Sequence, residues 1–234
     1  MDDHEARGCG PLSAGNADTD DVARLEFGRW LFAQQCDFVM GAAKLDDLPT
    51  AGLVELAFAG RSNVGKSSLL NALTGRRTLA RASNTPGRTR QINFFRLDGG
   101  TRGGLMLADL PGYGYARAPK EEIRQWTKLV RDYLAGRPGL RRVLLLIDAR
   151  HGLKSGDRAV MELLDETAVS YQIVMTKADK VAAAELDSRL SMTATALAKH
   201  GAAHPDIMIT SARKGSGIAA LRAALAALAA AGPS

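Results

Sequence analysis

The stretch that decides the fold is Gly60-Arg61-Ser62-Asn63-Val64-Gly65-Lys66-Ser67. It follows directly after the apolar run 53–59 and leads into a segment, 66–74, of helical period. Two glycines at this spacing, followed by a lysine and a hydroxyl residue, are typical of a phosphate-binding loop. The glycines let the backbone approach phosphate oxygens, and the helix N-terminus faces the anion. We therefore predict that Lys66 reaches the β- and γ-phosphates and that the Ser67 hydroxyl ligates Mg²⁺.

Outward from this loop, short apolar runs alternate with longer segments of helical period. The runs are 53–59, 91–97, 105–108, 143–147, 172–175 and 206–209, and the helical segments are 66–74, 119–135, 156–168, 182–200 and 217–230. Continuous apolar runs suit strands covered on both faces, as in parallel sheets. The pattern predicts a three-layer α/β fold with a mostly parallel sheet and helices on both faces. The closely spaced runs 91–97 and 105–108 predict a hairpin, and hence one antiparallel edge strand.

Length and composition place the chain among ordinary globular proteins. It has 234 residues, of which 46% are hydrophobic, enough for one domain and a tail. No apolar run approaches the roughly 18 residues of a membrane span, and the acidic N-terminus is unlike a secretory signal. We expect a cytoplasmic protein without membrane association. Cys9 and Cys36 have no partners at metal-ligand spacing and are expected to be free thiols.

Charge and hydropathy divide the chain into three parts. Residues 1–23 are predicted to be a disordered acidic tail, 24–52 an extension packed on the domain, and 53–231 the nucleotide-binding domain. Residues 1–27 hold seven acidic side chains against two arginines, whereas the remainder holds 29 basic and 18 acidic side chains. Such a basic surface favours encounters with nucleic acid or another polyanion; the alternative is a basic surface that only aids solubility.

A second motif, Asp109-Leu110-Pro111-Gly112, closes the run 105–108. A carboxylate at the end of a strand beside a phosphate loop can hold Mg²⁺ through water, and the glycine lets a backbone N–H approach the γ-phosphate. Asp-x-x-Gly is a common pattern. Without the phosphate loop, a turn that binds nothing would be the better interpretation.

A third motif, Thr176-Lys177-Ala178-Asp179, follows the run 172–175. A carboxylate accepts two hydrogen bonds at once, and guanine offers adjacent N1–H and N2–H₂ donors that adenine lacks. Asp179 is therefore predicted to select guanine, although an isolated Lys-x-Asp would be read as a polar turn. After the next run, a backbone N–H could donate to guanine O6 from the small residues Thr210-Ser211-Ala212.

Taken together, residues 38–228 resemble the EngB (YihA/YsxC) family of bacterial GTPases, within the Era/TrmE-like group. The resemblance is carried by residues 57–69, 79–81, 92–95, 109–116, 148–151 and 176–180, and by Thr85-Pro86-Gly87-Arg88-Thr89. It implies a P-loop GTPase fold, binding of GTP and GDP, and slow, Mg²⁺-dependent hydrolysis. It also implies a role in assembly of the large ribosomal subunit, and a link to normal cell division and septation.

The resemblance also implies a residue set for the site. Lys66, Thr89 and Gly112 would act on the phosphates, and Thr89 would join Ser67 and water-linked Asp109 around Mg²⁺. The loops 76–90 and 109–120 would be the two switches. The nucleotide would be bound by Gly60, Arg61, Ser62, Asn63, Val64, Gly65, Lys66, Ser67, Ser68, Gly87, Arg88, Thr89, Asp109, Leu110, Pro111, Gly112, Thr176, Lys177, Ala178, Asp179, Thr210, Ser211 and Ala212.

Partner and function remain open between several readings. A GTP-ordered first switch could bind ribosomal RNA through Arg76, Arg77, Arg81, Arg88 and Arg90; alternatively these arginines are only solvated, with Arg88 at the nucleotide. We expect a monomer that binds the large ribosomal subunit and no DNA. One rival is a GTP-gated ribosome-binding module in which hydrolysis is incidental. Another is a GTPase acting on tRNA or at a membrane, for which no added domain is left.

Four positions bear on the chemistry. Many GTPases place a water-orienting glutamine after Asp-x-x-Gly, where this chain has Tyr113. Thr176 replaces the usual asparagine, which predicts a looser tether to the phosphate loop. Asn63 resembles a potassium-binding asparagine, so K⁺ is a candidate cofactor; the alternative is a residue that caps a turn. His151 follows a strand, where a capping role is a better interpretation than catalysis.

Overall fold

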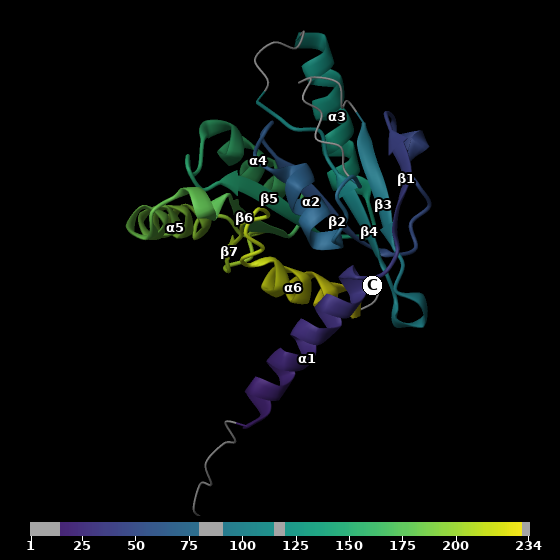
Figure 1. The fold of residues 1–234 in the computed structure, drawn as a ribbon. Coiled ribbons are helices and arrows are strands. Elements are labelled where there is room, and N and C mark those ends of the chain that lie inside the picture. Colours follow the sequence, from purple (N-terminus) through teal and green to yellow (C-terminus); the bar gives the residue numbers. More distant parts are fainter. Residues whose placement is uncertain (1–14, 80–90, 115–119, 231–234) are drawn as a thin grey trace, which may run out of the picture.

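The structure, a computed structural model, describes residues 15–79, 91–114 and 120–230. A seven-stranded sheet in the order β1-β3-β4-β2-β5-β6-β7 forms its centre (Figure 1). The strands are β1 (Cys36–Ala42), β2 (Val54–Gly60), β3 (Ile92–Leu97), β4 (Leu105–Asp109), β5 (Leu140–Asp148), β6 (Tyr171–Thr176) and β7 (Met208–Ile209). The α-helices are α1 (Gly15–Phe32), α2 (Lys66–Thr74), α3 (Lys120–Gly136), α4 (Ser155–Glu166), α5 (Ala183–Leu197) and α6 (Ile218–Ala230). Among these helices, none combines the length and apolar character needed to cross a bilayer.

The sheet is mostly parallel, which confirms the predicted α/β class. Strand β2 runs parallel to β4 and β5, and β6 and β7 continue the parallel order. Strand β3 is antiparallel to β4, as the predicted hairpin requires. It is not an edge strand, however, because β1 pairs antiparallel with its other side, placing Cys36 opposite Leu97 and Ala42 opposite Ile92.

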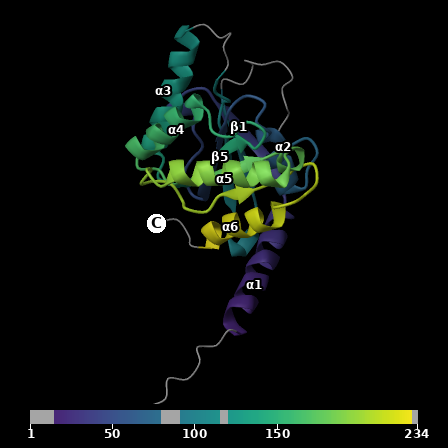
Figure 2. The same cartoon turned by 90° about the vertical axis from the view of Figure 1, so that its left-hand side faces the viewer.

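Helices cover both faces of the sheet and complete three layers (Figures 1 and 2). Successive strand residues point to opposite faces. Leu56 and Phe58 of β2 therefore join a core with residues of α1, α2 and α6, whereas Ala57 and Ala59 join a second core with residues of α3, α4 and α5. Every residue of β2 is buried. This explains the unbroken apolar run that precedes the phosphate loop.

Helix α1 differs from the sequence-based expectation. It includes residues 15–23, which we predicted to be disordered, and residues 1–14 lie outside the described ranges. Its second half is held by tertiary packing, because Leu31 and Phe32 are fully buried. A Cβ at Gly28 would lie 2.6 Å from the backbone nitrogen of Ala223, so α1 and α6 approach closely there. This anchored half allows the preceding residues, which are exposed from Thr19 to Glu26, to continue as helix.

Strand β1 was not recognised as a strand, and a β-bulge explains why. The pairing register with β3 shifts between Phe38 and Met40. A bulge interrupts the alternation of inward and outward side chains. Phe38 and Val39 are consequently both exposed, at 57% and 43%. The apolar residues of this segment therefore show no strand period in the sequence.

A buried polar cluster joins β2 to α3 at the end of the sheet away from the phosphate loop. Glu55 is 1% exposed and accepts a hydrogen bond from the Tyr133 hydroxyl. Its second carboxylate oxygen accepts from Arg137 Nε at 2.9 Å. Burial raises the pKa of the Tyr133 hydroxyl, and the Glu55 carboxylate raises it further, so the hydroxyl remains a donor. These contacts pair a charge that the core would otherwise exclude.

Candidate functional site

The phosphate loop lies between a strand and a helix, since Gly60 ends β2 and Lys66 begins α2. Two of its residues have left-handed backbone angles, with φ of 62° at Asn63 and 111° at Gly65. Asparagine tolerates this region and glycine adopts it without steric cost. Val64 is buried between them and holds the loop against the core. The turn thus leads directly into a helix N-terminus, an arrangement that favours anions.

The side chains expected around phosphate and metal lie together. Lys66 Nζ forms an ion pair with Asp109 Oδ1, and both side chains are largely buried. Asp109 ends β4, and Ser67 and Ser68 occupy the first turn of α2. The Lys66–Asp109 ion pair and the first turn of α2, with its two hydroxyl residues, therefore both lie at the carboxyl ends of β2 and β4. The carboxylate and hydroxyl oxygens belong to the hard donor class that Mg²⁺ prefers.

The second motif is attached to the phosphate loop by its backbone. Leu110 N–H donates to the Phe58 carbonyl at 3.0 Å and Tyr113 N–H donates to the Gly60 carbonyl at 3.3 Å. Between them, a Cβ at Gly112 would lie 3.1 to 3.3 Å from atoms of Ser62. Only glycine fits this approach without displacing its neighbour. Leu110 and Pro111 complete the turn and are buried.

Thr176 ties the third motif to the phosphate loop. Its hydroxyl donates to the Val64 carbonyl at 2.7 Å and lies 3.3 Å from the Ile147 carbonyl. The threonine therefore does provide a tether, because its hydroxyl reaches the loop carbonyl directly. Lys177, at a left-handed φ of 57°, adds a second connection. Its ammonium donates to the Asn63 carbonyl at 2.6 Å.

Asp179 stands at the exposed end of this motif. Its Oδ1 accepts a hydrogen bond from the Ser211 hydroxyl at 2.6 Å. This bond is the main cause that lowers the pKa of the Asp179 carboxyl, so the group is ionised at neutral pH. The Thr210 carbonyl accepts from Ala178 N–H at 3.2 Å, which joins the loop that follows β7, including Ala212, to the third motif.

Two residues were given no role from the sequence, although they organise the site. Asp148, at the end of β5, accepts from Lys177 Nζ at 2.8 Å and from Arg150 through Nε and Nη2 at 2.9 and 2.7 Å. Burial opposes ionisation of Asp148, but the bonds from Arg150 and Lys177 outweigh it and lower its pKa. The Asp-x-Arg spacing after an apolar run was the available signal. That spacing does not reveal that Asp148 also accepts a hydrogen bond from Lys177.

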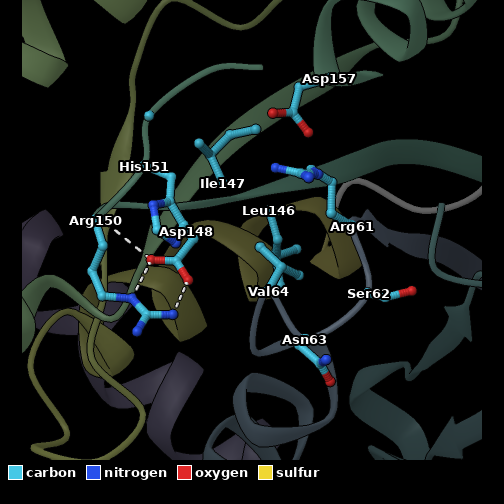
Figure 3. A pocket seen from close by; sticks show the side chains of 11 residues that line it. Arg61, Ser62, Asn63, Val64, Leu146, Ile147, Asp148, Arg150, His151 and Asp157 are labelled. Atoms are coloured by element: carbon cyan, nitrogen blue, oxygen red, sulfur yellow. Dashed lines mark hydrogen bonds and ion pairs between the residues drawn. The ribbon is translucent and has the colours of Figure 1, made fainter. Parts of the chain in front are cut away.

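A cavity of about 200 Å³ adjoins the outer side of the phosphate loop (Figure 3). Its walls include Arg61 and Asn63 of the loop, the end of β5, His151, and Asp157 of α4. Figure 3 shows the Arg61 side chain extending toward Asp157. His151 is exposed at the rim. The cavity therefore separates the phosphate loop from the start of α4.

Several predicted site residues cannot be placed. Gly87, Arg88 and Thr89 lie outside the described residues, as do Arg81 and Arg90. Arg76 and Arg77 are described and exposed directly after α2. The remaining predicted residues lie at the carboxyl ends of β2, β4 and β6, in the loops that follow β2, β4, β6 and β7, or in the first turn of α2. Because these strands are parallel, the loops share one edge of the sheet, where α/β proteins bind ligands.

Comparisons with known proteins agree with this arrangement. A family described as "50S ribosome-binding GTPase" matches residues 55–177. The "Probable GTP-binding protein EngB" of Rhodospirillum rubrum is 61% identical over 220 residues, covering 93% of this chain and 95% of that protein. Its counterpart in Cereibacter sphaeroides is 56% identical over 208 residues, covering 89% and 94%.

Solved structures share the fold. A probable GTP-binding protein engB has a TM-score of 0.58 at 24% identity, covering 74% of this chain and 97% of that chain. Era from Aquifex aeolicus, bound to GDP and AlF4⁻, has a TM-score of 0.61 at 19% identity, covering 76% and 57%.

A phosphate loop, a carboxylate after the neighbouring strand and a Thr-Lys-Ala-Asp motif on one sheet edge, together with these matches, define a P-loop GTPase, an enzyme that hydrolyses GTP. The chain belongs to the EngB family of GTP-binding proteins.

Proposed function

We propose that this GTPase is a Mg²⁺-dependent switch in the cytoplasm that acts on the maturing large ribosomal subunit and is linked to normal cell division and septation. The observation that supports it best is the family match over residues 55–177, whose description names the 50S subunit. Exposed Arg76 and Arg77 at the start of the proposed first switch add a basic surface beside the nucleotide. Residues 53–231 would form the GTP-binding domain of a monomer.

In this proposal the site residues divide by chemistry. The phosphate loop surrounds the phosphates with N–H groups, Lys66 neutralises charge that builds on the transferred phosphoryl group, and Gly112 contributes a backbone N–H. Ser67 and Asp109, with Thr89, would hold Mg²⁺, and the ion would supply positive charge that offsets the charge of the phosphates. Asp179 and the loop Thr210-Ser211-Ala212 bind the base. Lys177 holds the Thr-Lys-Ala-Asp motif to the phosphate loop through the Asn63 carbonyl.

The ribosomal role is tested by replacing Arg76, Arg77 and Arg81 with alanine together. Association with large ribosomal subunits in the GTP form should weaken by about tenfold or more, because each lost phosphate contact removes counterion release. Nucleotide affinity should change little. Co-sedimentation with subunits across a salt series measures the effect.

A matched control removes the same charge elsewhere, by replacing Lys128, Arg131 and Arg158. It should bind subunits as the unaltered protein does. Equal binding by both triple variants, or binding insensitive to salt, would contradict the proposed surface.

One observation favours a second candidate, a GTP-gated binding module in which hydrolysis is incidental. Tyr113 stands where many GTPases carry the water-orienting glutamine, and its side chain is only 8% exposed. It therefore points into the protein rather than toward an attacking water. Restoration of subunit assembly by a protein loaded with a non-hydrolysable GTP analogue would favour the module, and failure to complete assembly would favour the switch.

GTP hydrolysis is expected to depend on potassium, because Tyr113 stands in place of the water-orienting glutamine. With no glutamine to orient the attacking water, one source of transition-state positioning is absent. A monovalent cation held near Asn63 would stabilise the negative charge that develops on the phosphates. Turnover of GTP should be slow and roughly tenfold faster in KCl than in NaCl at equal ionic strength. Asn63→Ala should remove this difference. Equal rates in the two salts would exclude K⁺ from the mechanism and leave Asn63 as a turn residue.

A further inference from the structure

Tyr113 follows Gly112 directly and is fixed to the phosphate loop through its backbone. Its N–H donates to the Gly60 carbonyl at 3.3 Å, and its carbonyl accepts from Ser62 N–H at 3.1 Å. Arg61 and Tyr113 form a parallel β-bridge, which extends the pairing of β2 with β4 beyond Asp109. Any movement of Tyr113 therefore changes the position of Gly112 relative to this loop.

The side chain of Tyr113 is fixed to a different element. Its hydroxyl donates to Asp157 Oδ1 at 2.8 Å. Asp157 is 1% exposed, and its other oxygen accepts from Lys154 N–H at 2.8 Å, which caps the start of α4. Burial, followed by the Asp157 carboxylate, raises the pKa of Tyr113, so the hydroxyl remains protonated and donates. The Arg61 side chain extends toward the same carboxylate across the cavity (Figure 3).

Tyr113 thus joins three elements. Its backbone holds the Asp-x-x-Gly turn to the phosphate loop, and its hydroxyl holds the turn to Asp157 at the N-terminus of α4. A buried carboxylate is costly to leave without a donor, so this contact resists opening. The close approach of Gly112 to Ser62, where a Cβ would come within 3.1 Å, leaves little tolerance for a shift of the turn.

We propose that Tyr113 is a positioning residue for GTP hydrolysis, which holds the Gly112 N–H at the γ-phosphate by hydrogen bonding to Asp157. In place of a side chain that orients water, this chain has one that fixes the turn carrying Gly112. The inference rests on the proposed role of Gly112. It adds that α4, which contributes no predicted nucleotide ligand, determines how well GTP is distinguished from GDP.

The test uses Tyr113→Phe, which removes only the hydroxyl. Affinities for GDP and for a non-hydrolysable GTP analogue are measured by fluorescence titration, together with kcat and KM for GTP. The ratio of analogue to GDP affinity should fall about tenfold, as expected for a lost hydrogen bond to a charged group. The value of kcat should fall with it while GDP affinity stays close to normal.

Two further variants separate positioning from general stability. Tyr171→Phe removes another buried tyrosine hydroxyl, one without a hydrogen-bond partner among the described residues, and should leave the ratio unchanged. In an Asp157→Ala background the ratio should already be low, and Tyr113→Phe should lower it no further. An unchanged ratio in Tyr113→Phe, or an equal loss with and without Asp157, would overturn the proposal.

Failure of the proposed guanine-nucleotide site would give a different result from failure of the Tyr113 proposal. If Asp179→Asn left GTP affinity intact, the nucleotide site itself would be misplaced. If Asp179→Asn loses GTP affinity as expected, but Tyr113→Phe keeps the ratio of analogue to GDP affinity, only the positioning role of Tyr113 would be ruled out.

Discussion

Replacement of Asp179 by asparagine is expected to reverse the base preference of the protein. The carboxylate is exposed, and the Ser211 hydroxyl orients it by donating to Oδ1 at 2.6 Å, so the group is accessible to a base. An amide places a donor against the N1–H of guanine, and GTP affinity should fall on the order of a hundredfold or more. Xanthosine nucleotides carry a carbonyl that accepts the new donor, so their affinity should rise.

Competition between GTP, ATP and xanthosine triphosphate for the purified variant measures this reversal. Asp206→Asn, at an exposed aspartate with a side chain 77% exposed, provides the control and should keep the preference for GTP. Retained GTP affinity in Asp179→Asn would rule out this carboxylate as the guanine ligand.

Replacement of Glu55 by alanine is expected to destabilise the fold by about 3–5 kcal/mol, because it leaves a buried guanidinium without its partner. The Arg137 side chain is 8% exposed and that of Glu55 only 1%. The Tyr133 hydroxyl, fully buried, would lose its acceptor as well. Urea unfolding followed by circular dichroism gives the free energy, provided that the slope of the transition is unchanged.

A surface ion pair supplies the comparison. Arg131 and Glu166 approach to 2.6 Å, but their side chains are 58% and 59% exposed. Glu166→Ala should therefore cost less than about 1 kcal/mol. Similar losses in the two variants would show that burial of the Glu55 cluster adds nothing to its strength.

The parts of the fold that followed from the sequence are those in which neighbouring residues carry the information. The phosphate loop is a contiguous stretch between an apolar run and a helical segment, and the parallel strands are unbroken apolar runs because both faces are covered. Segment 36–42 lacked this signal, since the bulge at Phe38 disturbs its alternation. Helix α1 depends on contact with α6, and no local propensity reports such a contact.

The site shows the same division. The three motifs could be recognised one by one, and their common position followed from the parallel order of the strands. The bond from Tyr113 to Asp157 spans 44 residues of sequence, and that from Lys177 to Asp148 spans 29. Neither spacing is a pattern, because the fold alone brings the partners together. The Thr176 tether was not foreseen for a related reason: its partner, the Val64 carbonyl, lies 112 residues away in the sequence.

The close contact of α1 with α6 has a consequence for how the chain folds during synthesis. The surface that receives Gly28, Leu31 and Phe32 belongs in part to residues 218–230, so α1 stays without its partner until that helix has left the ribosome. Contacts between segments so distant in sequence form late and slow the folding reaction. Completion of the domain therefore coincides with emergence of α6, and until then Leu31 and Phe32 lack part of the apolar surface that covers them in the folded protein.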